Sequence, residues 1–201
     1  IDLKKIKTSS ALNIQGMFQN CKSLTSVDVT NFDTSNVEKI SFLFSHCNSL
    51  KEIDVSKFDT SNVIDMTGLF EECKTLASVD VSNFNTAKTI SITYLFKACS
   101  SLTSIDVSNF DTKNIYTMSF AFADCKSITS LDLSKFDTNK VNNLNGIFSG
   151  CTSLKHLNIE SFNTTNVNHF AYMFENCHSL TSIDISHFDT QNAKSYFYMT
   201  S

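Results

Sequence analysis

Cysteine is the most reactive side chain in this sequence, and it recurs at a fixed interval of 26 residues. Such a column could form disulfides, hold zinc or supply a catalytic thiolate. Stacked copies would point their Cβ atoms the same way, an odd count leaves one thiol unpaired, and zinc needs ligands that converge from several directions. We therefore predict a reduced column that fills the core, with no metal and no catalytic role. Its members are Cys21, Cys47, Cys73, Cys99, Cys125, Cys151 and Cys177.

The histidines do not accompany the cysteines, because they occupy five different positions of the 26-residue repeat. Stacking would not bring them together into a catalytic triad or a metal cluster. The sequence also contains no Gly-rich phosphate loop and no nucleophile elbow. These observations predict a protein that is not an enzyme and uses no cofactor. The histidines are His46, His156, His169, His178 and His187.

A column of aspartates, flanked by serine or threonine, is the first candidate binding face. In one interpretation each carboxylate accepts hydrogen bonds from neighbouring hydroxyls or backbone groups and is purely structural. In the other, the column is an anionic strip that binds cations, basic peptides or sugar hydroxyls. The sequence leaves both open. The candidate face comprises Asp28, Asp54, Asp80, Asp106, Asp132 and Asp184, with Ser78, Ser104 and Ser130 beside them.

An aromatic column, interrupted by Gly68 and Gly146, is the second candidate. Its rings could stack on sugars or pack on a partner protein if they are exposed, or they could fill grooves between the repeats. The column consists of Phe42, Tyr94, Phe120, Tyr172 and Tyr198.

An unbroken threonine column follows an aspartate or asparagine in every repeat. Turn chemistry explains this placement. Regular threonine ladders also resemble the faces of ice-binding solenoids, which adds a less favoured function of a different class. The column contains Thr34, Thr60, Thr86, Thr112, Thr138, Thr164 and Thr190.

The elements that must position these columns follow from the spacing of apolar residues. In the unit 47–72, Leu50, Ile53, Val55 and Phe58 give the pattern L-x-x-L-x-L-x-x-F of a leucine-rich-repeat strand. Residues 63–73 then carry apolar side chains every three or four positions, which predicts short helical or irregular turns, or a second strand. The predicted fold is an α/β leucine-rich-repeat-like solenoid with a parallel strand face and these turns opposite; the alternative is an all-β solenoid.

The whole chain, 1–201, is predicted to be a single repeat array. Residues 1–20 align with the tail of one repeat, and full repeats start at each of the seven cysteines. A single unit cannot bury its apolar face, so the repeats must stack about 4.8 Å apart. The stacked core should contain the cysteines together with Phe44, Phe70, Phe96 and Phe110. Because Ile1 opens in mid-pattern, we expect a segment of a longer protein.

Composition excludes two classes of partner. With a formal net charge of −4, a pI near 5.7 and no arginine, the chain lacks the basic surface that grips nucleic acid. The longest apolar run, residues 170–174, is far shorter than the roughly 20 residues of a membrane helix. We therefore predict no nucleic-acid binding and no membrane span.

The stretch from Met173 to Thr190 resembles the BspA-like leucine-rich-repeat surface proteins, with repeats of the form MFxxCxSLTSxDxSxFDTxNV. The stretches 95–112 and 43–60 repeat the match. The resemblance implies an extracellular, cell-surface array that is not an enzyme and mediates adhesion to host matrix or to other cells. It implies a protein or glycan partner at a cell surface, with cations on the Asp column as a further candidate. The alternative function is a structural spacer that carries a separate binding domain.

Overall fold

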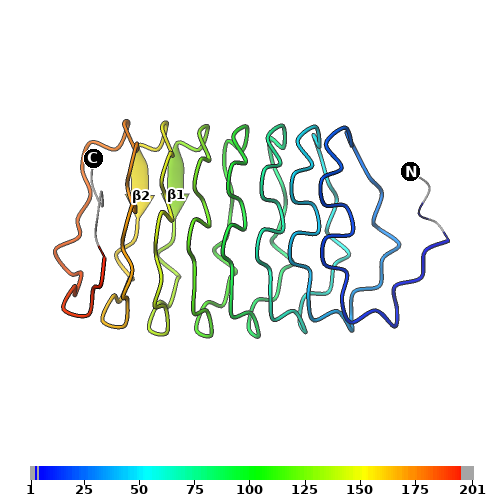
Figure 1. Cartoon of the computed structure of the whole chain (residues 1–201), viewed down its shortest axis with the longest axis horizontal. Coiled ribbons are helices and arrows are strands. Elements are labelled where there is room, and N and C mark those ends of the chain that lie inside the picture. The colour runs from blue at the N-terminus through cyan, green and yellow to red at the C-terminus, as the bar shows by residue number, and fades with distance from the viewer. Residues whose placement is uncertain (1–2, 4, 196–201) are drawn as a thin grey trace.

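The computed structural model describes residue 3 and residues 5–195 as one solenoid, in which each repeat of 26 residues forms one rung. Parallel β-bridges join the same position of consecutive rungs, from Asn13↔Lys39 to His169↔Ser195. Figure 1 shows the rungs side by side in chain order along the long axis of the molecule. The period of the sequence is therefore the period of the coil.

The most regular side of each rung is a run of turns, which we call the turn wall and define by residues 40–47 and their equivalents. The N–H groups of Ile40, Phe42, Phe44 and His46 donate to carbonyls of the next rung at 3.3, 2.8, 3.0 and 2.7 Å. The N–H groups of residues 43, 45 and 47 donate to the carbonyls three residues earlier, at 3.2, 3.1 and 3.1 Å. Alternate N–H groups thus join rungs and close turns.

The predicted helical turns are wrong, because the residues that the structure describes contain no helix. Two positions of every turn wall have positive φ, as at Phe42 (57°) and His46 (59°), whereas a right-handed helix needs negative φ throughout. Turns closed by a bond three residues back also place apolar side chains inward every three or four positions. That spacing is what resembled a helix in the sequence, so the prediction of irregular turns is the one that holds.

The leucine-rich strand segments lie on another side of the rung, where backbone pairing is sparse. Strand β1 (Ser130–Asp132) pairs in parallel with β2 (His156–Asn158) in the register Ser130↔His156 and Asp132↔Asn158. No other strand is present in residues 3 and 5–195. The predicted strand face is therefore regular at only two neighbouring rungs. Alternation of burial is nevertheless as predicted, with Val55 buried and Asp54 exposed.

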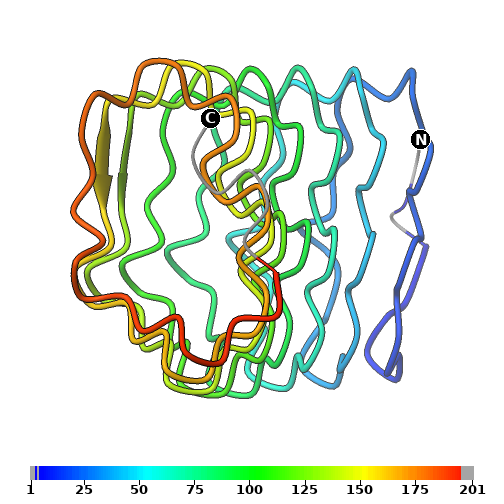
Figure 2. The ribbon, with the colours of Figure 1, turned by 60° about the vertical axis from the view of Figure 1, so that its left-hand side comes forward.

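The stacked rungs surround the interior of the solenoid (Figure 2). One continuous core of buried side chains fills this interior. Phenylalanines three residues before each cysteine stack on one another, with ring centroids 5.5 Å apart for Phe18 and Phe44 and 5.7 Å apart for Phe70 and Phe96. The predicted core residues Phe44, Phe70, Phe96 and Phe110 are all buried. Burial of each such side chain contributes about 1.5–3 kcal/mol, so stacking supplies the driving force for folding.

Candidate functional site

The Asp column is exposed to solvent on the strand side of the solenoid, where each aspartate closes a tight turn. The Oδ1 atom of Asp54 accepts the backbone N–H of Ser56 at 2.9 Å, and the same bond recurs two residues after every aspartate of the column. Asp28 also accepts the Thr30 hydroxyl at 2.6 Å. All six aspartates are exposed. Each carboxylate therefore makes the hydrogen bond that the structural interpretation predicts, and it also remains accessible to a partner.

These hydrogen bonds lower the pKa of five of the six aspartates. The hydroxyl and the backbone N–H of the following serine lower the pKa of Asp54, Asp80 and Asp184 below the ordinary value. For Asp106 and Asp132 the backbone N–H is the larger cause of the lowered pKa. Charge repulsion from Asp28 opposes the lowering at Asp54 as the smallest cause. The strip therefore stays negative at neutral pH.

We call the exposed aspartates of this column, with the serine or threonine residues beside them, the Ser-Asp-Ser face. Grooves lie between rungs on this face, including one beside Asp28 and one beside Asp132. The larger, of about 590 Å³, has a floor of half-buried Val27 and Ile53 and a rim of Asp28, Glu52 and Asp54. A second, of about 420 Å³, lies over β1 and β2. Its lining residues include Lys155, His156 and Asn158, at positions where most repeats have Thr, Ser and Asp. The face thus changes from acidic to mixed charge along the array.

The three candidate serines divide between these features. Ser78, Ser104 and Ser130 are all exposed beside the column, but only Ser130 lines one of these two grooves. In the described part of the chain, no three His, Cys, Asp or Glu side chains come together to hold a metal ion. A chelated cation on the Asp column therefore has no built site there.

The threonine column is buried between the rungs rather than displayed on a face. The Thr60 hydroxyl donates to the carbonyl of Asn85 at 3.0 Å and accepts the N–H of the same residue at 2.7 Å. Thr112 bridges to Asp137 in the same way, at 2.9 and 2.7 Å. From Thr34 to Thr164 the column is at most 2% exposed. The ice-binding alternative, which needs these hydroxyls at the surface, is wrong.

The aromatic column leans along the array instead of projecting from it. The Phe42 ring lies against Gly68 and the Phe120 ring against Gly146, so closely that an added Cβ would come within 2.4 and 2.1 Å. The rings of Tyr94 and Phe120 stack with centroids 5.7 Å apart. Phe42, Tyr94 and Phe120 are half-buried, which favours the groove-filling interpretation, whereas Tyr172 is 38% exposed. Tyr198 lies outside the described residues.

The cysteines are free thiols in the core, as predicted. Six of the seven are buried and Cys21 is half-buried. Each buried thiol donates to a phenylalanine carbonyl of the preceding rung, as Cys99 Sγ does to Phe70 O at 3.0 Å. Burial raises the pKa of Cys47 and Cys177 to about 11 and raises the pKa of Cys99 well above its ordinary value.

The sequence of this solenoid matches a known protein family. A family model described as "Mycoplasma protein of unknown function, DUF285" matches residues 1–104 and 90–201, which together cover the whole chain. The chain belongs to the DUF285 family. No curated protein matches it.

Solved structures similar to this DUF285 chain are bacterial leucine-rich-repeat proteins. The T. pallidum leucine-rich-repeat protein TpLRR is 24% identical with a TM-score of 0.56, over 84% of this chain and 71% of that one. A leucine-rich-repeat protein from Bacteroides ovatus ATCC 8483 is 21% identical with a TM-score of 0.50, over 91% of this chain and 45% of that one. These similarities show a leucine-rich-repeat solenoid fold and, with the family match, confirm the BspA-like resemblance.

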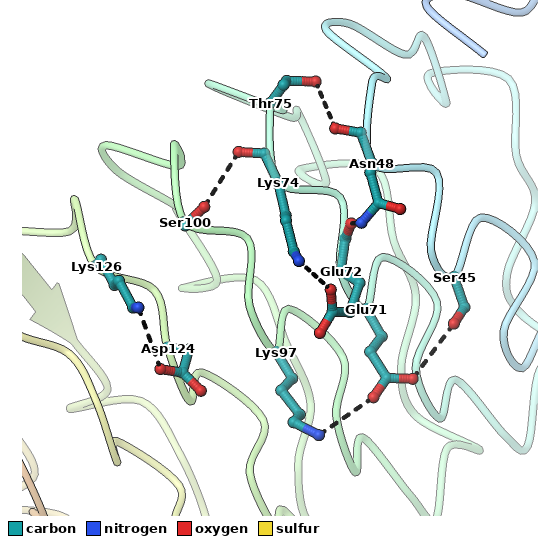
Figure 3. A network of polar contacts seen from close by, with 10 residues as sticks. All are labelled: Ser45, Asn48, Glu71, Glu72, Lys74, Thr75, Lys97, Ser100, Asp124 and Lys126. Carbon is teal, nitrogen blue, oxygen red and sulfur yellow. Dashed lines mark hydrogen bonds and ion pairs between the residues drawn. The ribbon is translucent and has the colours of Figure 1, made fainter. Parts of the chain in front are cut away.

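A network of charged residues near the end of the turn wall of this DUF285 chain was not predicted from the sequence (Figure 3). Lys97 pairs with Glu71 at 3.4 Å and lies over the Tyr94 ring at 4.7 Å, and the Ser45 hydroxyl donates to Glu71 at 3.3 Å. Lys74 pairs with Glu72 at 2.8 Å. The sequence did contain one signal for this network: its columns change residue type from rung to rung, whereas the core columns keep theirs.

No helix in the described residues has the length and apolarity to cross a bilayer.

Proposed function

We propose that the chain is a protein-binding repeat domain of a cell-surface protein, and that its Ser-Asp-Ser face is the binding surface. The observation that carries this is a row of six exposed, ionised carboxylates held in one repeated geometry. Fixed side chains lose little conformational entropy on binding, which favours recognition by a rigid face. Adhesion to host matrix or to another cell is the role we infer for this binding, with an extracellular location.

The chemistry of the face favours a basic partner segment. Ionised carboxylates attract lysine or arginine side chains, and each has lone pairs beyond the one that accepts the backbone N–H two residues later. The groove between Asp28 and Asp54 adds an apolar floor of Val27 and Ile53, on which the methylene stem of a lysine can lie. A glycan would use the same hydroxyls and carboxylates without the charge attraction.

The test compares two triple variants of equal charge. Asp80, Asp106 and Asp132 are changed together to Asn, which keeps the turn-closing acceptor, since Asn158 already accepts the Glu160 N–H at 3.2 Å. The control changes Asp33, Asp59 and Asp137, which close similar turns in another column, to Asn. Immobilised arrays are screened against matrix proteins, a glycan panel and an oligolysine peptide.

We expect saturable, salt-sensitive binding that the first triple variant weakens at least about tenfold and the control leaves within about twofold. Equal loss in both variants would indicate nonspecific attraction to net charge and contradict the assignment of this face. Absence of binding to every probe would favour the spacer role instead.

A further inference from the structure

A notch in the charged network of Figure 3 has the form of a small binding site, separate from the Ser-Asp-Ser face. It measures about 330 Å³ and is lined by Glu72, Lys74, Ala98, Ser100, Asp124 and Lys126. The pair Lys74–Glu72 lies on one side at an N–O distance of 2.8 Å, and the pair Lys126–Asp124 on the other at 4.0 Å. The rung between them carries only small side chains at these positions, Ala98 and Ser100.

The notch exists because two columns change residue type together at one rung. The first reads His46, Glu72, Ala98 and Asp124, and the second, two residues later, has Lys74, Ser100 and Lys126 at the same rungs. Long charged side chains thus flank a short alanine and a serine. Two rungs at about 4.8 Å each separate the two ion pairs by roughly 10 Å. A small molecule fits in the space between the two ion pairs, and the charged side chains on both sides can contact it.

The charges around the notch form two rows of opposite sign. Glu72 and Asp124 make an acidic row on the turn-wall side, and Lys74 and Lys126 make a basic row beside it. We propose that the notch binds a zwitterion with a primary ammonium and an anionic oxygen group, the ammonium between the carboxylates and the anionic group between the lysines. The turn wall behind it is fixed by inter-rung bonds, including Glu72 N to Lys97 O at 2.7 Å and Ala98 N to Ala123 O at 2.7 Å.

Other ligand classes fit this charge pattern less well. A divalent cation would meet two lysine ammonium groups, and the described residues place no three metal-binding side chains together. A free phosphate or other simple anion would meet two carboxylates. A zwitterion places a charge of opposite sign beside each row. Free amino acids and the head group of phosphatidylethanolamine both present this chemistry.

The experiment follows the backbone amide signals of Ala98 and Ser100 by NMR during titration with glycine. Because all four charged side chains are partly exposed, we expect saturable shifts with a Kd on the order of 1 mM. Methylammonium chloride and sodium acetate, which each carry one half of the charge pattern, should bind at least about tenfold more weakly. If methylammonium or acetate bound as tightly as glycine, the proposal would be overturned.

Vesicles distinguish the two sources of the zwitterion. Cosedimentation with phosphatidylcholine vesicles, with and without phosphatidylethanolamine, tests the lipid head group. Binding of glycine or of the phosphatidylethanolamine vesicles supports the proposal and identifies the source. Binding of neither overturns it, whatever the outcome for the Ser-Asp-Ser face.

Two variants test the geometry. Ala98→Gln fills the notch without altering charge, and its backbone fits, since Glu72 and Asp124 in the same column have φ of 60° and 56° beside the 58° of Ala98. The double variant Asp124→Lys with Lys126→Asp keeps the net charge but reverses one half of each row. Both should weaken binding about tenfold, whereas Lys113→Gln, which removes the remote 2.7 Å ion pair with Asp111, should leave it unchanged. Wild-type affinity in the first two variants would refute the assignment.

Discussion

At the scale of single residues, the buried hydroxyl groups of the threonine column connect neighbouring rungs in place of a direct backbone hydrogen bond. Thr112 satisfies both the N–H and the carbonyl of Asp137, and three other threonines of the column, Thr60, Thr138 and Thr164, make the same double bridge. Valine has the same shape without the hydroxyl. A buried donor and acceptor left without a partner cost about 1–3 kcal/mol.

We therefore expect Thr112→Val to lower the free energy of unfolding by about 1–3 kcal/mol, measured by urea denaturation. Thr8 provides a matched control in the same column, because its buried Oγ1 has no hydrogen-bond partner. Thr8→Val should be neutral or slightly stabilising. Equal losses in the two variants would show that the column contributes through shape and not through bridging.

The thiols make a second residue-scale prediction, about accessibility. In the native array a thiol reagent should modify Cys21 first, because it is half-buried while the other six cysteines are buried. All seven should react after denaturation. Mass spectrometry of the labelled protein gives the number of modified thiols. Rapid labelling of Cys99 or Cys125 in the native protein would contradict their burial in the core.

The same thiols predict an alkaline loss of stability. Burial raises their pKa in the folded state, to about 11 for Cys47 and Cys177, so folding favours the neutral thiol. This stabilisation is complete below the ordinary thiol pKa and is lost as pH rises through the folded value. The urea midpoint should therefore fall between pH 9 and about 11. Changing Cys73, Cys99 and Cys125 to Ala should make that decline shallower, and an unchanged slope would contradict its assignment to the thiols.

At the scale of elements, the turn wall shows what the sequence could and could not predict. The period, the inward columns and the exposure of Asp54 follow from spacing alone, because they depend on which side chains are apolar. Backbone conformation was not predictable in the same way, because Phe42 and Tyr94 adopt positive φ although nothing in an aromatic residue signals it. Gly68 and Gly146 in the same column were the available clue, and they also explain where the rings go.

The ring-on-glycine contact gives an element-scale prediction. An alanine Cβ at Gly146 would lie 2.1 Å from the Phe120 ring on a backbone with φ of +55°, so Gly146→Ala should cost roughly 2–4 kcal/mol of unfolding free energy. At Gly16, φ is similar but the nearest contact is 3.2 Å away, so Gly16→Ala should cost only about 1 kcal/mol. In a Phe120→Ala background, the cost of Gly146→Ala should fall toward the value at Gly16. Additive losses would contradict the contact.

At the scale of the whole molecule, stability should depend on position along the array. Phe96 stacks on Phe70 at 5.7 Å and on Phe122 at 5.8 Å, whereas Phe18 stacks on only one ring of the same column, Phe44. Phe96→Ala should cost about 3–5 kcal/mol in denaturant unfolding, and Phe18→Ala less. If the two substitutions lowered the free energy of unfolding equally, contacts between neighbouring rungs would not be the source of the stability.

The bonds of the turn wall also give the array an electrical direction. In each wall from residues 14–20 to residues 144–150, four N–H groups point toward the C-terminal side. One bond per rung, such as Ile90 N to Ile64 O, points the other way, and some rungs add a second, such as Lys51 N to Thr25 O. Peptide dipoles that align in this manner add, as they do along a helix. The solenoid is therefore polarised along its axis, positive toward the later rungs and negative toward the earlier ones. A charged group that lies against the turn wall would therefore be attracted toward one direction along the solenoid axis and repelled from the other.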